Sequence, residues 1–375
     1  MSSEQDQALA QSLLSGEAWR TFCDELKAAG DLIISDQVPQ SPLQRAEGFR
    51  YLTRVMRMGL EMVLEHGNPE APQLWFQDET VKSGGDNPDN LYYWGRIRGS
   101  YSYRLKGVLA QPEYLTINIY AGGLNQPGGR RIVADLDVAD LQLDSEGRFN
   151  LVLAQYPPGD ECAGQWVPIT EDAGTVLVRE TVADRSAARS EFQIERLERD
   201  QPPAPLDPLA MAKALRSVAG LVRYSSKYFG EMARQWSHTP NTFFASDADA
   251  NAASFGNLNY QYPSAYFEVG ADEALLIRFQ PPPCVFWSLV LYNYWMESLD
   301  YRYRPIHLNK VTAQLDAEGF VNIVIAHRDP QLTGYQWLDV EGHTEGILTL
   351  RFVGAEPQPL PHIEKVPWSS LRHMQ

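Results

Sequence analysis

The chain has few cysteines, a shortage of positive charge and no long apolar run. Its 3 cysteines, Cys23, Cys162 and Cys284, lie far apart without a C-x-x-C pair, which disfavours a disulfide framework or a zinc site. Lys and Arg number 32 against 48 Asp and Glu, so the surface would repel a phosphate backbone and we expect no nucleic-acid binding. No segment approaches the about 18 apolar residues that suggest a membrane helix. We expect no membrane insertion.

Several sequence signals are also missing. The N-terminus has no basic segment followed by an apolar one, so we expect a cytoplasmic protein. There is no G-x-G-x-x-G, G-x-x-x-x-G-K-[ST], G-x-S-x-G or H-E-x-x-H motif. These motifs mark dinucleotide-binding folds, P-loops, serine hydrolases and zinc proteases. We therefore expect no cofactor and no catalytic metal.

Aromatic residues, in contrast, are abundant, with 9 Trp, 18 Tyr and 14 Phe. Such side chains fill β-sandwich cores or line apolar pockets. A length of 375 residues exceeds one ordinary domain, so we expect two or three units.

Helical spacing of apolar residues dominates the start of the chain. Two short helices interrupted at Gly16 are followed by a longer one that ends near Gly67. The stretch SPLQ, Ser41 to Gln44, has the pattern of a capping box with proline at the first helical position. Further along, Asp207 before a proline predicts the N-cap of another helix with one apolar stripe.

From residue 91 the chain consists of short segments rich in Val, Ile, Thr and aromatic residues, separated by Gly, Pro and Asp turns. This pattern is typical of antiparallel sandwiches. The predicted fold class is α+β, mainly β, with two related antiparallel β-sandwich domains, each preceded by helical segments. The expected division is a helical N-terminal segment 1–80, a first β-sandwich 81–198, a Pro-rich linker and helix 199–240, and a second β-sandwich 241–375.

An internal repeat supports two sandwiches of common design. The segment LQLDSEGRFNLVLAQ at 141–155 matches AQLDAEGFVNIVIAH at 313–327, including an L-D-x-E-G turn. Beyond each turn a Trp follows at nearly the same distance, and an Arg, Arg179 or Arg351, at the same distance. A feature present in both halves is most simply explained by their shared fold. We therefore interpret the Trp as core and the Arg as a tie from a strand to a carboxylate or carbonyls.

Polar residues without a counterpart in the first half are the stronger candidates for chemistry. Asp339 and His343 form such a pair, with His343 as the acid/base and Asp339 as its orienting carboxylate. His327 and Asp329 lie nearby and are candidate substrate contacts. Whether the protein is an enzyme stays open; if it is one, we expect a cofactor-independent hydrolase, lyase or isomerase. The alternative is that His343 is an ordinary loop residue.

A polar loop before the first aromatic strand is a second candidate. Asp86, Asn87 and Asp89 precede a strand that contains Tyr92, and all four are candidate substrate contacts. The loop lacks the order of an EF-hand, and Asp and Asn are common turn formers, so a metal site is the weaker interpretation.

The segment 284–304 has bulky residues on both of its alternating faces. It forms either ordinary core or an aromatic pocket for a flat or apolar ligand. Its candidate ligand contacts are Trp287, Tyr294 and Arg304, together with Asn309 just after the segment.

Four stretches together resemble bacterial proteins that carry the domain of unknown function 1214. Members show a D-P-G…N-W-L-D-T-x-G-H-x-x-G-x-x-x-x-R pattern near the C-terminus. The stretches are 43–61, 84–107, 286–304 and 328–352, and the matching residues are Asp329, Pro330, Trp337, Leu338, Asp339, Gly342, His343, Gly346 and Arg351. Gln331, Gln336 and Val340 replace the usual Gly, Asn and Thr. The resemblance implies a jelly-roll-like β-sandwich architecture and suggests a lipid- or steroid-like ligand.

The leading expectation is a cytosolic protein that binds an apolar or aromatic small molecule in a pocket at the domain junction, with acid/base transformation left open. A second hypothesis is a non-catalytic carbohydrate- or partner-binding β-sandwich protein. A third is an assembly protein whose exposed aromatic residues form homo-oligomer interfaces.

Overall fold

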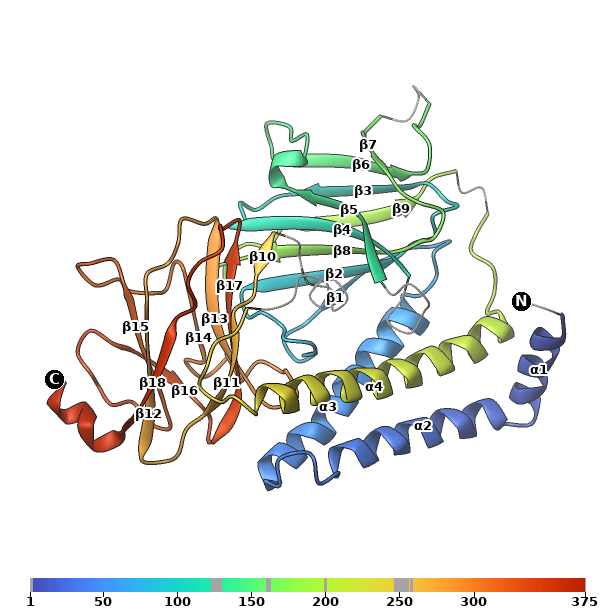
Figure 1. Ribbon diagram of the computed structural model, residues 1–375. Helices are drawn as coiled ribbons and strands as arrows, with labels where there is room; N and C mark the ends of the chain where they lie inside the picture. Colours follow the sequence, from blue (N-terminus) through green and yellow to red (C-terminus); the bar gives the residue numbers. More distant parts are fainter. Residues whose placement is uncertain are drawn as a thin grey trace.

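The computed structural model describes residues 3–122, 130–159, 163–198, 201–245, 256 and 259–374. Two stacks of β-sheets lie against a layer of helices, with the helices along one side of the molecule (Figure 1). The fold is α+β and mainly β, as the sequence predicts.

The helical layer combines the N-terminal helices with a long helix from the middle of the chain. Its elements are α1 (Ser3–Leu14), α2 (Glu17–Ile33), α3 (Pro42–Leu60), the π-helical turn η1 (Glu61–Glu65) and α4 (Pro208–Trp236). The break at Gly16 is confirmed, with φ of 75°. Asp207 caps α4 as predicted, since its Oδ1 accepts a hydrogen bond from the Leu209 amide at 2.9 Å.

The predicted capping box at the start of α3 is wrong. Ser41 makes no side-chain hydrogen bond to the helix, although Pro42 occupies the first helical position. The Gln44 side chain donates instead to the carbonyl of Glu345, at 3.3 Å. The Gln44 side chain therefore bonds to the second sandwich and not to the start of its own helix, as a capping box would require.

The first sandwich contains a sheet of order β1-β2-β8-β4-β5 and a sheet of order β7-β6-β3-β9. The strands are β1 (Leu74–Gln77), β2 (Asn90–Arg96), β3 (Tyr103–Val108), β4 (Tyr114–Gly122), β5 (Arg130–Asp137), β6 (Arg148–Ala154), β7 (Gln165–Pro168), β8 (Ala173–Thr181) and β9 (Glu191–Arg196), with a 3-10 turn η2 (Val138–Asp140). Strand β1 lies before the expected boundary at 81 and pairs with β2. Leu105, Ile117, Leu151 and Val178 belong to the apolar core of this sandwich.

The second sandwich has the same plan. One sheet has the order β10-β17-β13-β14, with β11 also paired to β17, and the other has the order β16-β15-β12-β18. The strands are β10 (Tyr260–Gln261), β11 (Ser264–Glu268), β12 (Glu273–Phe279), β13 (Phe286–Tyr292), β14 (His307–Asn309), β15 (Val321–Ala326), β16 (Gln336–Asp339), β17 (Glu345–Val353) and β18 (His362–Pro367), followed by a 3-10 turn η3 (Trp368–His373).

The sequence repeat corresponds to repeated structure. In each half a strand of the repeat pairs in parallel with the strand that carries the Trp, as β6 with β7 and β15 with β16. The indole nitrogens of Trp166 and Trp337 donate to the carbonyls of Ala154 and Ala326, both at 3.0 Å. The expectation that these rings are core is wrong for Trp166, which is 38% exposed. The indole lies over the sheet margin, where its N–H reaches a strand carbonyl.

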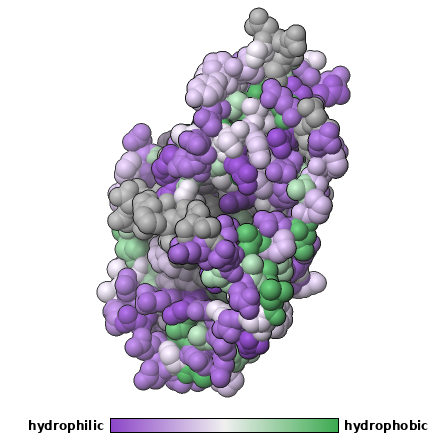
Figure 2. Space-filling model, turned by 90° about the vertical axis from the view of Figure 1, so that its right-hand side faces the viewer, coloured by the Kyte–Doolittle hydropathy of each residue, from purple (hydrophilic) through white to green (hydrophobic). Residues whose placement is uncertain are grey.

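Within the described ranges, no helix has both the length and the apolar character needed to cross a membrane. Figure 2 shows a mainly hydrophilic face on which hydrophobic residues form separate patches. Scattered apolar patches of this kind are normal on protein surfaces.

Candidate functional site

The two sandwiches meet where β2, β4 and β8 of the first approach β10, β13 and β17 of the second (Figure 1). The hydroxyl groups of Thr181 in β8 and Tyr260 in β10 lie 3.4 Å apart across this boundary. Burial raises the pKa of Tyr260 to about 12. Helix α4 borders the same region, because the Tyr294 hydroxyl after β13 donates to the carbonyl of Gly230 at 3.0 Å.

The first sandwich contributes a buried arginine to this junction. Arg179 in β8 is 5% exposed and pairs in register with Tyr92 on one side and Thr116 on the other. Its Nη1 donates to Asn118 Oδ1, and its Nη2 donates to the Tyr120 hydroxyl at 3.2 Å. Both of these neighbours are on β4, so the sheet itself orients the guanidinium group.

The second sandwich contributes the equivalent arginine. Arg351 in β17 is 6% exposed and pairs in register with Ser288 on β13. Its Cζ lies 5.5 Å from the ring centre of Tyr292 and 5.8 Å from that of Tyr262. Its Nη2 donates to the carbonyl of Gly85 at 2.6 Å, while Nη1 is buried with no hydrogen-bond partner among the described residues.

The two guanidinium groups face the same aromatic surroundings. The phenols of Tyr92 and Tyr262 lie near both Arg179 and Arg351. Burial also raises the pKa of the Tyr292 hydroxyl far above its usual range, so this group is neutral at physiological pH. We call Tyr92, Arg179, Tyr262, Tyr292 and Arg351 the junction site.

A third cation lies close to the junction site. Arg130 in β5 is near Arg179, Tyr120 and Tyr224 of α4. Burial lowers the pKa of Arg130 to about 9. Like charges this close create a positive potential in a region with little water, which favours an anion.

His343 lies apart from the junction site, in a buried charge network. It is 2% exposed, its Nε2 lies 2.8 Å from Glu47 Oε2 on α3, and its Nδ1 lies 2.7 Å from the Val340 carbonyl. Because both neighbours accept hydrogen bonds, the doubly protonated ring is favoured. Burial alone would lower the pKa of His343, but the hydrogen bond and charge of Glu47 outweigh it and raise the pKa.

The expectation that Asp339 orients His343 is wrong. Asp339 Oδ2 pairs with Arg304 at 2.7 Å, and its Oδ1 accepts a hydrogen bond from the Glu341 amide at 2.8 Å. Glu47 occupies the orienting position instead. Helix α3 supplies this partner, 296 residues away along the chain, and local spacing could not indicate it.

The Asp/Asn loop after β1 connects the two sandwiches. Asp86 accepts hydrogen bonds from the amide and hydroxyl of Ser298, at 2.9 and 2.7 Å. Asp89 accepts one from Asn309 Nδ2 at 2.9 Å, and Asn87 accepts one from the Asp89 amide at 3.1 Å. These polar atoms are thus used by the fold, directly beside the junction site that Tyr92 enters from the following strand.

The other candidate residues from the sequence, Trp287, His327 and Asp329, do not lie together in one site. Trp287 is core, packed edge-on against Phe279 with ring centres 5.3 Å apart. His327 Nε2 lies 3.2 Å from the Val269 carbonyl. Asp329 is exposed and accepts a hydrogen bond from the Gln331 amide in its own turn.

Among the candidates from the sequence, only Tyr92 belongs to the junction site. The recurrence of Arg179 and Arg351 predicts a structural role for both, yet the fold places both at one boundary. Thr116 and Tyr120 on β4 have the same spacing as Ser288 and Tyr292 on β13. This repeated hydroxyl and phenol beside each Arg is the sequence signal that could have identified the site.

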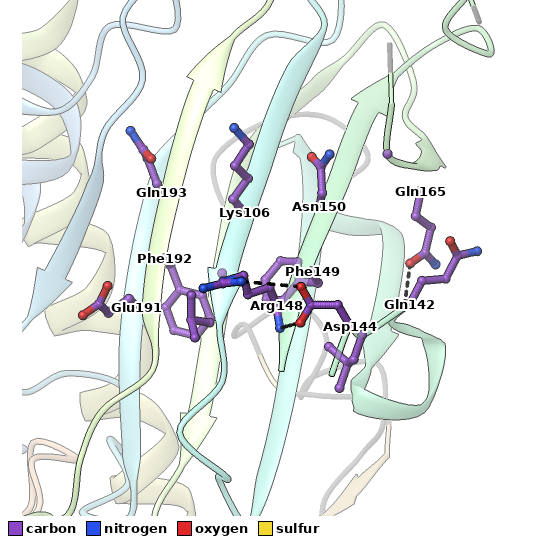
Figure 3. Close-up of a pocket in the computed structure, with 14 residues that line it drawn as sticks. Lys106, Gln142, Asp144, Arg148, Phe149, Asn150, Gln165, Glu191, Phe192 and Gln193 are labelled. Carbon is purple, nitrogen blue, oxygen red and sulfur yellow. Dashed lines mark hydrogen bonds and ion pairs between the residues drawn. The ribbon is translucent and has the colours of Figure 1, made fainter. Parts of the chain in front are cut away.

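A separate groove of about 800 Å³ lies on the outer face of β3, β6 and β9 (Figure 3). Lys106, Asn150 and Gln193 project from the strands along this groove. The half-buried Phe192 borders them, whereas the ring of Phe149 belongs to the core of the first sandwich and is 3% exposed. In the described part of the chain, no group of His, Cys, Asp and Glu has the arrangement of a metal site.

The model of the family described as "Protein of unknown function (DUF1214)" matches residues 270–357. The chain belongs to this family. The matched part of this DUF1214 protein contains Ser288, Tyr292, His343 and Arg351, whereas Arg179 lies outside it.

Solved structures resemble this DUF1214 protein over nearly its whole length. A crystal structure of an uncharacterized protein from Burkholderia cenocepacia is 37% identical, covers 96% of this chain and 99% of its own, and has a TM-score of 0.91. The VPA0106 protein from Vibrio parahaemolyticus is 13% identical over 91% of this chain and 100% of its own, with a TM-score of 0.50. The latter likeness shows the fold alone. No curated protein matches the chain.

Proposed function

We propose that this protein is a cytoplasmic small-molecule binder that holds an apolar or aromatic ligand, lipid- or steroid-like in character, at the junction site of two jelly-roll-like sandwiches. The observation that carries the proposal is the convergence on two buried arginines of Tyr92 from β2, Tyr292 from β13 and Tyr262 from the connection between β10 and β11. Aromatic walls with a few placed polar groups are the usual composition of ligand sites.

Accessibility also supports the junction site. Tyr92 and Tyr262 are half-buried, whereas Tyr292 and both arginines are buried. A ligand can therefore contact the outer rings first and the charged groups deeper in the junction. Pockets often form at such boundaries between domains.

Acid/base catalysis by His343 has less support than binding. Both ring nitrogens have protein partners and the side chain is 2% exposed. A general acid or base needs a nitrogen within reach of the substrate. The geometry of His343 suits attachment of α3 to the second sandwich.

The proposal is tested by native mass spectrometry of the full chain purified from the producing cells, followed by denaturation and identification of any released molecule. We expect an apolar or aromatic compound in the wild type and a loss of at least tenfold in occupancy for Tyr262→Ala. Tyr156→Ala is the matched control, because Tyr156 is 77% exposed in a turn after β6. Equal occupancy in both variants would exclude the junction site.

The groove on β3, β6 and β9 favours a second candidate function, non-catalytic carbohydrate binding. Lys106, Asn150 and Gln193 lie in register on three neighbouring strands and offer a row of hydrogen-bonding groups to sugar hydroxyls, with the half-buried Phe192 beside them. A glycan array probed with wild type and Lys106→Ala tests it. Binding that Lys106→Ala does not weaken, or a blank array, would remove this candidate.

A further inference from the structure

We infer that the ligand of the junction site has an oxyanion head group, a carboxylate or a phosphate, which the guanidinium group of Arg351 holds between the two sandwiches. This inference rests on the proposed function and specifies the chemical class of the ligand.

The first argument is the unbalanced charge of Arg351. Its side chain is 6% exposed and its Nη1 has no hydrogen-bond partner among the described residues. The groups that contact the guanidinium are neutral, namely the carbonyl of Gly85 and the hydroxyl of Tyr292. A buried charge without an opposite charge is costly. An anionic ligand at Nη1 would supply both the missing charge and the missing hydrogen bond.

The acidic residue at this place in the fold does not serve Arg351. Asp86 acts electrostatically on Tyr292, but its two carboxylate oxygens accept hydrogen bonds from the amide and hydroxyl of Ser298. Asp86 therefore fixes the loop position and leaves the guanidinium group for another anion.

The second argument is a pair of buried hydroxyl groups. Ser288 lies directly across from Arg351 and is 0% exposed, and Thr116 lies directly across from Arg179 and is 1% exposed. Neither hydroxyl has a hydrogen-bond partner among the described residues. Unsatisfied buried hydroxyls are rare in proteins, and each can donate to an oxyanion bound by the neighbouring Arg.

The third argument is the presence of more than one cation. Arg179 shares Tyr92 and Tyr262 with Arg351, and Arg130 adds a third guanidinium group nearby. Neutral apolar ligands need no such charge. The tyrosine rings would then contact the apolar part of the ligand while Arg351 fixes its charged end.

Calorimetric titration of the full chain with matched acid and amide probes tests the inference. We expect benzoate and octanoate to bind at least tenfold tighter than benzamide and octanamide, which have nearly the same shape without the charge. Phenyl phosphate and inorganic phosphate are titrated in the same way to distinguish the two kinds of head group. Tighter binding of phenyl phosphate than of benzoate would identify a phosphate head group. Both results support the oxyanion.

The variants locate the effect. Arg351→Met should remove the preference for the acid over the amide, whereas Arg351→Lys should retain part of it. Arg328→Met is the control, because Arg328 has a side chain that is 57% exposed and lies over Trp368, remote from the junction. Equal binding of acids and amides by the wild type would overturn the oxyanion while leaving small-molecule binding intact.

The thermal stability of dialysed protein distinguishes a ligand residue from a structural one. If Arg351 is kept for a ligand, Arg351→Met removes an unpaired buried charge and leaves Tm unchanged or higher without ligand. A large drop in Tm would show that Arg351 stabilises the fold and would overturn the assignment. If no acid or amide binds and native mass spectra show no bound molecule, both the inference and the proposed function fail.

Discussion

Buried charges in this protein are of two kinds. His343 is matched by Glu47 within the chain, whereas Arg351 has no carboxylate among its hydrogen-bond partners. The sequence shows that His343 has no equivalent in the first half of the repeat. It cannot show that His343 is buried, because the surroundings of His343 depend on where α3 packs. The same reasoning assigns Arg351 to the scaffold, since a recurring residue usually reflects a shared fold. Two related halves that meet at one boundary can instead bring equivalent residues into one site.

Replacement of His343 by Gln should destabilise the protein by about 1.5–3 kcal/mol below pH 6, because Glu47 loses its buried charged partner and keeps only the half-exposed Arg50, 3.1 Å from its other oxygen. The folded-state pKa of His343 is raised, so its contribution is fully present below its ordinary pKa near 6.5. That contribution is lost as the pH rises through the folded-state pKa. The difference between wild type and variant should therefore shrink at alkaline pH, as measured by urea unfolding.

The exposed His362 provides the control, since His362→Gln should leave this pH profile unchanged. A stability difference for His343→Gln that stays constant from pH 5.5 to alkaline pH would contradict a charged His343.

At the scale of elements, helical periodicity and the Asp207 cap predict their helices correctly because these signals are local. The capping box at Ser41 fails because Gln44 bonds with Glu345 in the second sandwich. The close packing of α3 is also invisible in the sequence. A Cβ on Gly48 would lie 2.5 Å from Ile33 Cγ2 and 2.8 Å from Trp295 Cε2. The absence of a side chain at this position lets α2, α3 and the second sandwich meet.

Gly48→Ala should therefore destabilise the protein by about 1–3 kcal/mol through overpacking, although alanine favours helices. Gly30→Ala in α2 is the matched variant, because no atom lies within 4 Å of the added Cβ. It should stabilise the protein by about 0.4–1 kcal/mol. Denaturant unfolding monitored by circular dichroism measures both, and effects of the same sign would refute this account of α3 packing.

At the scale of the whole molecule, the repeat predicts two sandwiches but not how they face each other. The repeated segments determine each sandwich separately, whereas their relative placement depends on contacts without a counterpart in the other half. The hydrogen bonds of Asp86 with Ser298 and of Asp89 with Asn309 are two such contacts. The junction site is a consequence of that placement, and local sequence patterns therefore do not show that Arg179 and Arg351 come to the same boundary.

Asp86→Ala should loosen the junction itself. It removes the acceptor of the Ser298 amide and hydroxyl, both in a buried setting, at a cost of about 1–3 kcal/mol. Because the lost contacts join the two sandwiches, hydrogen exchange should increase at Ser298 and at the strands that meet there, while the cores of the sandwiches remain protected. Asp329→Ala removes the same charge from an exposed turn and should change neither stability nor exchange at the junction. Faster exchange throughout both sandwiches in Asp86→Ala would show that the loop supports global folding rather than the relative placement of the two halves.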